Sequence, residues 1–206
     1  MVFPDTSPRN TNIEGVSESW EKGNSASFYV DATSEKYKKH FQMCTYITEE
    51  LPKLVSKYFP ISLENKSITG FSMGGHGALI CALKSGLYKS VSAFAPISNP
   101  SACERWGKAA YKDFFADPEN EGKSWDTVEL IKQGNQPNIP IFVEVGTHDK
   151  FAELLCYDNL LKALNESNVD YIHKERSGYN HNFFYVSTFI GEHIDFHSKF
   201  LNTEWK

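Results

Sequence analysis

The stretch Ser67-Ile68-Thr69-Gly70-Phe71-Ser72-Met73-Gly74-Gly75 decides the fold of this 206-residue chain. A Gly-x-Ser-x-Gly pattern here separates a β-branched run from an Ala/Leu-rich run, which predicts a strand, a sharp turn at Ser72 and a helix. The serine of such a turn has a strained backbone, and the residues two positions away must be small because the strand and the helix nearly collide. The turn exposes the Ser72 hydroxyl at a helix start, where negative charge is stabilised. No Gly-Lys-Ser/Thr follows, which disfavours a phosphate-binding loop, so Ser72 is a candidate nucleophile.

Downstream of this turn, short β-rich runs alternate with helical patterns. Strands are expected over 66–69, 90–95, 140–145 and 169–174, and helices over 74–84, 151–165 and 183–200. Such alternation predicts a mostly parallel sheet flanked by helices. Together with the serine turn, it predicts an α/β-hydrolase fold built as a single domain over residues 1–206.

The remaining segments are less regular. Residues 5–33 predict a long surface loop, and residues 45–58 predict a helix in which Pro52 starts a turn or introduces a kink. Residues 97–138 contain Trp106, Trp125 and several helix breakers, so we interpret them as an insertion between two strands. Insertions of this kind commonly cover a pocket.

A serine nucleophile needs a base, and the base needs a carboxylate that orients it. In this fold the chain order is serine, then acid, then histidine. Asp149 follows the apolar run 141–145 in a loop at the end of a strand, although it could instead cap the helix expected from residue 151. His181 lies in a glycine-bearing loop between the last strand and the terminal helix. Asp149 and His181 are therefore the candidate acid and base.

The other histidines fit the role of base less well. His40 precedes the serine, and His76 lies on the helix that follows it. His148 adjoins Asp149, and His173 lies within a predicted strand. His193 and His197 have the i, i+4 spacing of a helical metal site, but no glutamate completes a His-Glu-x-x-His pattern. We interpret these two as helix surface or core edge, and we expect neither a metal nor a cofactor.

Bulk properties limit the partners of the chain. The net charge of -5, without a basic cluster, disfavours nucleic acid. No apolar run approaches the roughly 18 residues of a membrane helix, and the residues after Met1 do not form a signal peptide. The four cysteines lack Cys-x-x-Cys spacing; they could form two disulfides, but we expect them to be reduced. These observations predict a cytoplasmic protein.

Many short segments carry a resemblance to one known family: 4–9, 18–20, 28–33, 48–52, 72–84, 88–97, 99–100, 106–108 and 178–181. In these segments the chain resembles the S-formylglutathione hydrolases, also called esterase D. The resemblance extends over nearly the whole chain and is far more specific than the Gly-x-Ser-x-Gly pattern alone. It implies a serine thioesterase that hydrolyses S-formylglutathione to formate and glutathione in formaldehyde catabolism, with a carboxylesterase side activity.

The same resemblance implies roles for individual residues. It implies a triad of Ser72 as nucleophile, Asp149 as the group that orients the base, and His181 as general base and acid. It also implies an oxyanion-hole donor in the backbone N–H of Met73, and it allows a homodimer. The family usually has histidine before the nucleophile, where this chain has Phe71; the change alters the surroundings of the turn without removing a triad member.

In the resemblance, residues 1–4 correspond to the end of a strand well inside the family's domain. About 70 residues would then precede them, with a loop that supplies a second oxyanion-hole donor and a strand beside residues 66–69. Loss of one such donor costs a factor of about 10²–10³ in rate, and an unpaired strand edge favours aggregation. We therefore expect an N-terminally truncated domain that is poorly stable or weakly active in isolation.

Three interpretations of function stay open at this point. The first is a thioester hydrolase of which this chain is a fragment. The second is an inactive remnant that acts as a binding or interaction protein. The third keeps the serine chemistry and changes the substrate, giving a general short-chain carboxylesterase or an acyltransferase.

Overall fold

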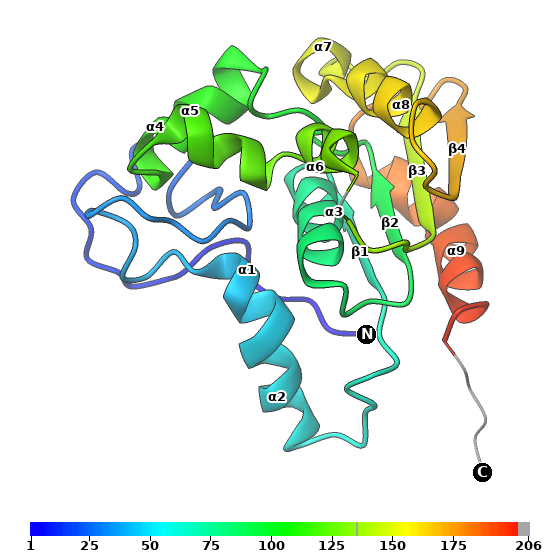
Figure 1. The fold of residues 1–206 in the computed structure, drawn as a ribbon, viewed down its shortest axis with the longest axis horizontal. Coiled ribbons are helices and arrows are strands. Elements are labelled where there is room, and N and C mark those ends of the chain that lie inside the picture. Colours follow the sequence, from blue (N-terminus) through cyan, green and yellow to red (C-terminus); the bar gives the residue numbers. More distant parts are fainter. Residues whose placement is uncertain (135, 202–206) are drawn as a thin grey trace.

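A parallel β-sheet forms the centre of the molecule, for which a computed structural model describes residues 1–134 and 136–201. Within that part of the chain, the sheet has four strands in the order β1-β2-β3-β4 (Figure 1). The strands are β1 (Ile68–Phe71), β2 (Val91–Phe94), β3 (Ile141–Gly146) and β4 (Tyr171–Arg176), and all neighbours are parallel. The four predicted strands and the α/β class are confirmed, although β1 and β4 each begin and end two residues later than expected. Among the described residues β1 pairs with β2 alone, so it is an outer strand.

Twelve helical segments of different lengths connect and cover these strands within the described residues. They are α1 (Met43–Thr45), η1 (Tyr46–Glu50), α2 (Leu51–Ser56), α3 (Met73–Ser85), η2 (Glu104–Lys108), α4 (Ala109–Phe114), α5 (Pro118–Glu121), η3 (Gly122–Trp125), α6 (Thr127–Gln133), α7 (Ala152–Leu155), α8 (Tyr157–Asn165) and α9 (Phe183–Ser198). None of them is long and apolar enough to cross a membrane.

Two predicted helices differ in detail from the structure. The helix expected over 45–58 runs through α1, η1 and α2. Its π-helical turn η1 ends two residues before Pro52, whose nitrogen has no hydrogen for the regular helical bond. The single helix expected over 151–165 is wrong. It is divided into α7 and α8 at Cys156, which has a φ of 50° in the left-handed region.

Helices cover both faces of the sheet. The helices α3, α6 and α8 lie in front of it in Figure 1, and α9 packs against β2 and β3. The side chains of β2 alternate accordingly. Ala93 lies beside Gly75 of α3, because a Cβ at Gly75 would lie 3.3 Å from that of Ala93. Phe94 points the other way and stacks on His193 of α9 with 3.7 Å between the ring centroids.

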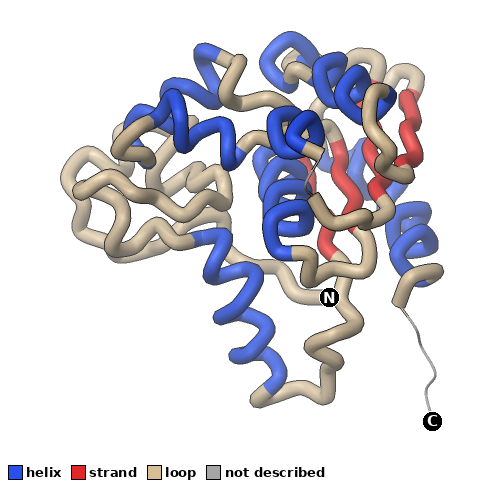
Figure 2. Tube along the Cα trace, viewed as in Figure 1, coloured by secondary structure: helices blue, strands red, loops and turns tan. Residues whose placement is uncertain are grey.

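Residues 1–42 contain no helix and no extended strand, as Figure 2 shows. The prediction of a surface loop over 5–33 is nevertheless wrong for its second half. Phe28 and Val30 are buried, and the ring of Tyr29 lies so close to α3 that a Cβ at Gly77 would be 2.4 Å from it. This segment therefore packs core side chains against α3. An irregular segment can be buried in this way when its backbone N–H and C=O groups find hydrogen-bond partners.

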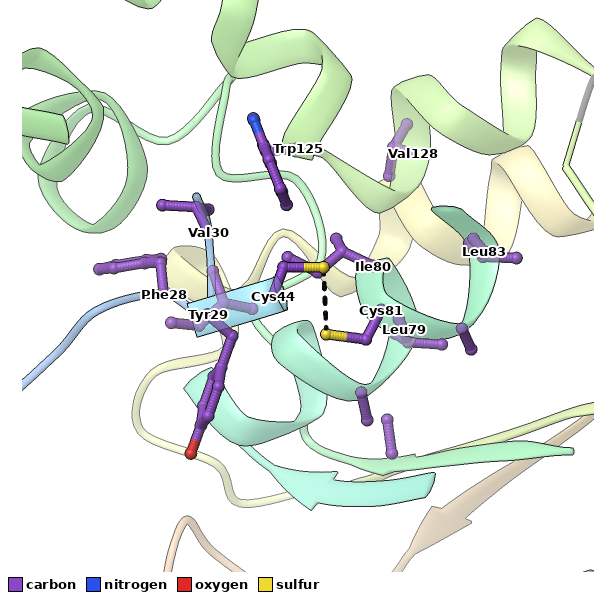
Figure 3. Close-up of a cluster of buried hydrophobic side chains, with 14 of the residues drawn as sticks. Phe28, Tyr29, Val30, Cys44, Leu79, Ile80, Cys81, Leu83, Trp125 and Val128 are labelled. Atoms are coloured by element: carbon purple, nitrogen blue, oxygen red, sulfur yellow. Dashed lines mark hydrogen bonds between the residues drawn. The ribbon is translucent and has the colours of Figure 1, made fainter. Parts of the chain in front are cut away.

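A close-up of this core shows the thiols of Cys44 and Cys81 side by side (Figure 3). Their sulfur atoms are 3.6 Å apart, at the junction of α1 and α3. Both side chains are buried, and all four cysteines of the chain are free thiols. The contact joins the N-terminal segment to the helix that follows Ser72.

The buried face of α9 carries two histidines beside the aromatic rings of Tyr185 and Phe196. His197 bonds the hydroxyl of Ser90 through Nδ1 (2.7 Å) and that of Ser92 through Nε2 (2.8 Å), and Nδ1 of His193 lies 2.8 Å from the same Ser92 oxygen. Both histidines are buried, so their placement on the helix surface is wrong and core edge describes them better. In the described residues, no cluster of three or more His, Cys, Asp or Glu side chains could hold a metal ion.

Candidate active site

The predicted turn at Ser72 joins β1 to α3. Ser72 has φ 58° and ψ −116°, a region that costs a non-glycine residue energy and persists where the surrounding structure enforces it. Two backbone bonds enforce it here: Ser72 N donates to Phe94 O (2.9 Å), and Ile97 N donates to Ser72 O (3.2 Å). The turn is therefore fixed to the end of β2 on both sides of the serine.

The two glycines that flank Ser72 are not equivalent. A Cβ at Gly70 would lie 2.1 Å from the carbonyl oxygen of Gly74, so Gly70 is required by the close approach of strand and helix. A Cβ at Gly74 would meet nothing within 4 Å. The expectation that both positions must be small is thus confirmed for Gly70 and wrong for Gly74.

Asp149 and His181 lie together at the same end of the sheet as Ser72. His181 Nδ1 is 2.7 Å from Asp149 Oδ2, and both side chains are largely excluded from solvent. The other carboxylate oxygen, Oδ1, accepts a bond from Phe151 N at 2.8 Å, ahead of α7. The structure therefore pairs Asp149 with the imidazole, whereas the expected N-cap role is wrong, because Phe151 is the N-cap residue of α7 and no side chain caps that helix.

The loops after β3 and β4 are joined along their length, which brings Asp149 and His181 together. His148 N donates to Tyr179 O (2.9 Å), and Gly178 N donates to Thr147 Oγ1 (3.0 Å). The approach is closest at Gly146, where a Cβ would lie 2.2 Å from Tyr179 O. Parallel strands end at one edge of a sheet, so loops after neighbouring strands can bond in this way.

Ser72 and His181 make no hydrogen bond in the described part of the chain. Their link is Phe71, whose ring lies 4.5 Å from the imidazole centroid, at 36° to it. Nε2 of His181 is likewise free of hydrogen bonds to described residues, and apo hydrolases often show a long contact here. Met73 begins α3, and its N–H donates to no backbone carbonyl among the described residues. A free N–H at a helix start can bind a negatively charged oxygen.

Aromatic side chains around His181 were not assigned to the site from the sequence. Phe151 meets the imidazole edge-on, at 5.1 Å and 89°, and Trp106 packs against Phe151 at 4.8 Å. Trp106 belongs to the predicted insertion, so this segment reaches the site through one ring. The sequence signal was the position of Phe151 directly after the acid loop, which was attributed to the start of a helix.

The site does not coincide with a hollow between the ends of α6 and α8. That hollow has a volume of about 520 Å³ and is lined by residues of both helices and of the segments that follow them. None of Ser72, Asp149 and His181 lines it. The three side chains instead lie at the C-terminal edge of the sheet, where ligands of open α/β sheets bind.

A parallel sheet with a strained serine turn and a paired aspartate and histidine in the order Ser72, Asp149, His181 defines a serine esterase of the α/β-hydrolase fold. A family model described as a putative esterase matches residues 1–197. A solved S-formylglutathione hydrolase from Agrobacterium tumefaciens superimposes with a TM-score of 0.90 and 34% identity, over 97% of this chain and 72% of that one.

Curated proteins agree with the structural comparison. The S-formylglutathione hydrolase of Bos taurus is 43% identical over 98% of this chain and 72% of its own length. The S-formylglutathione hydrolase of Arabidopsis thaliana is 39% identical over 98% of this chain and 71% of its own length. The chain belongs to the S-formylglutathione hydrolase family, which confirms the resemblance found in the sequence.

Proposed function

We propose that this chain hydrolyses S-formylglutathione to formate and glutathione, with Ser72 as nucleophile, His181 as general base and acid, and Asp149 as the group that orients His181. The observation that carries the proposal is the 2.7 Å contact between Asp149 and His181, at the sheet edge where the Ser72 turn also lies. The names of the relatives supply the substrate.

In the first half of the reaction, Ser72 Oγ attacks the formyl carbonyl carbon and His181 Nε2 accepts the hydroxyl proton. Asp149 holds the Nδ1 proton, which keeps the tautomer that leaves Nε2 free to act as the base. The carbonyl oxygen becomes negatively charged, and the N–H of Met73 at the start of α3 stabilises it.

In the second half, the C–S bond breaks and glutathione leaves. A thiol has a pKa of about 8.5, so it departs with little acid assistance and takes up the proton that His181 accepted from Ser72, which makes the imidazole neutral again. The formyl ester on Ser72 then requires water activated by His181, which makes deacylation the step that depends most on the base. His181 donates the proton that it took from this water to Ser72 Oγ when formate is released.

A fluorophosphonate probe tests this assignment. We expect covalent labelling of the wild-type chain and of Ser85→Ala, a control at the far end of α3, and no labelling of Ser72→Ala. If the folded wild-type protein is not labelled, the chain is a non-catalytic binding protein. Turnover of a short-chain aryl ester, but not of S-formylglutathione, would assign a general carboxylesterase instead.

The finer predictions about organisation join this proposal. A reducing compartment such as the cytoplasm fits the four free thiols, and cell fractionation tests it. A single domain and a homodimer stay predictions, which limited proteolysis and light scattering of the purified chain can test. The small-molecule substrate is consistent with a net charge of -5, which does not favour nucleic acid.

A further inference from the structure

Two phenyl rings pack against the imidazole of His181. Phe71 lies over it at a tilt of 36° with 4.5 Å between centroids, and Phe151 meets it at 89° and 5.1 Å. The His181 side chain is only 9% exposed. We define Phe71 and Phe151 as the aromatic clamp.

We propose that Phe71 is a positioning residue for His181, which fixes the plane of the base relative to Ser72 and stabilises its charged form during proton transfer. The proposal rests on the proposed function, since it concerns how the base works in that reaction. The proposal requires no contact of Phe71 with the scissile carbonyl or with a reacting atom. It acts through the imidazole.

The hydrogen bond to Asp149 alone does not fix the orientation of the ring. A single contact at Nδ1, 2.7 Å long, restrains one atom but permits the imidazole plane to rotate about the line of that bond. A second ring against one face of the imidazole, even at a tilt of 36°, restricts this rotation. The Phe71 ring supplies that surface, and Phe151 limits movement from a second direction.

Phe71 is suited to this role by its place in the chain. It is the last residue of β1 and is covalently bonded to Ser72, so its ring moves with the backbone of the nucleophile. Its backbone is in register with Phe94 of β2, whose carbonyl oxygen accepts the bond from Ser72 N. The stack therefore connects nucleophile and base through one residue, in a structure where no direct hydrogen bond joins the two described side chains.

The same contact favours the reacting state electrostatically. When His181 takes the Ser72 proton it becomes a cation, and the face of an aromatic ring attracts a cation. The neutral imidazole of the resting enzyme receives much less of this stabilisation. An interaction that is stronger in the transition state than in the ground state raises kcat and leaves KM almost unchanged.

Phe71→Leu is the direct test, because it keeps an apolar side chain and removes the ring face. We expect kcat for a short-chain ester to fall about tenfold with KM nearly unchanged. Phe71→Tyr keeps the face and should stay within about twofold of wild type. Phe184→Leu is the matched control, since that ring is 81% exposed and only two residues from His181's neighbour Asn182. It should leave both constants unchanged.

Equal losses in Phe71→Leu and Phe71→Tyr, or a Leu variant as fast as wild type, would overturn the proposal. If Phe71→Leu does not fold, Phe71→Met serves as the second variant without a ring, with the same expected loss. A rise in KM as large as the fall in kcat would also count against a positioning role.

An independent readout separates this proposal from the proposed function. At one alkaline pH, the His181 ring protons should resonate upfield of those of exposed His40, because they lie over an aromatic face. Phe71→Met should move them downfield. If the wild-type chain neither turns over esters nor reacts with the probe, the proposed function fails while this spectrum still decides whether the stack exists; an unshifted His181 signal overturns the clamp.

Discussion

Replacement of Gly70 by alanine should disable the serine turn. The added Cβ would lie 2.1 Å from the carbonyl oxygen of Gly74, 2.2 Å from its carbonyl carbon and 2.8 Å from Gly75 N. These are backbone atoms of the first turn of α3, so no side-chain rotation relieves the overlap. The end of β1 and the start of α3 must therefore separate by about 1 Å, the distance that brings the shortest contact to an acceptable length.

The separation has two measurable costs. Overpacking of a close contact typically costs about 1–3 kcal/mol of stability. A displacement of about 1 Å at the nucleophile lowers the rate about 10²-fold, because the attack geometry is lost. We expect Gly70→Ala to show both effects, with the loss of kcat/KM the larger of the two.

The control is Gly74→Ala, where an added Cβ meets open space. Alanine in a helix is favoured over glycine by about 0.5–1 kcal/mol, so this variant should be slightly more stable and as active as wild type. The assay is kcat/KM for an aryl ester together with a thermal unfolding curve. A folded Gly70→Ala protein with near wild-type kcat/KM would refute the reasoning, and so would equal losses in the two variants.

Three further predictions concern the acid, the core and pH. Asp149→Asn should lower kcat for ester hydrolysis about 10⁴-fold, because an amide no longer holds the required tautomer of the base; a loss below about tenfold would contradict this role. Arg176→Met should lower the free energy of unfolding by about 3–5 kcal/mol in urea titration, because Glu144 is fully buried and loses its charged partner. Burial lowers the pKa of His197 to about 4 and that of His76 to about 3, whereas the unfolded chain titrates at about 6.5. Their neutral forms therefore stabilise the fold fully above about pH 6.5, and the stability is lost as pH falls towards 4, by about 2 kcal/mol per histidine at pH 5. Thermal unfolding at pH 7 and pH 5 checks this, and equal midpoints would contradict it.

The sheet and the serine turn could be predicted because their signals are local. A β-branched run followed by Gly-x-Ser-x-Gly specifies strand, turn and helix within nine residues, and the chain order then assigned Asp149 and His181. The structure brings these two predicted residues into contact, at 2.7 Å between His181 Nδ1 and Asp149 Oδ2. The catalytic role of this contact is still a proposal.

The errors arose where distant residues decide the outcome. Residues 28–30 have no regular pattern, and their burial depends on α3, which lies far along the chain. The break at Cys156 places its backbone in the left-handed region, which apolar periodicity around it does not reveal. The contact of Phe71 with His181 likewise joins the end of β1 to the loop after β4, so no spacing in the sequence indicates it.

The buried histidines of α9 determine how this helix is positioned along its axis relative to the sheet. Apolar contacts are non-directional, whereas hydrogen bonds need fixed partners. A shift of α9 by one turn, about 5.4 Å, would leave the buried hydroxyls of Ser90 and Ser92 without the hydrogen bonds to His197. The hydrogen bonds of His193 and His197 therefore fix the position of α9 along its axis, and so the residue at which the helix begins. His181 lies just ahead of that beginning, so the position of the base is set in part by side chains three helical turns away, on the opposite side of the sheet from the helix that Ser72 begins.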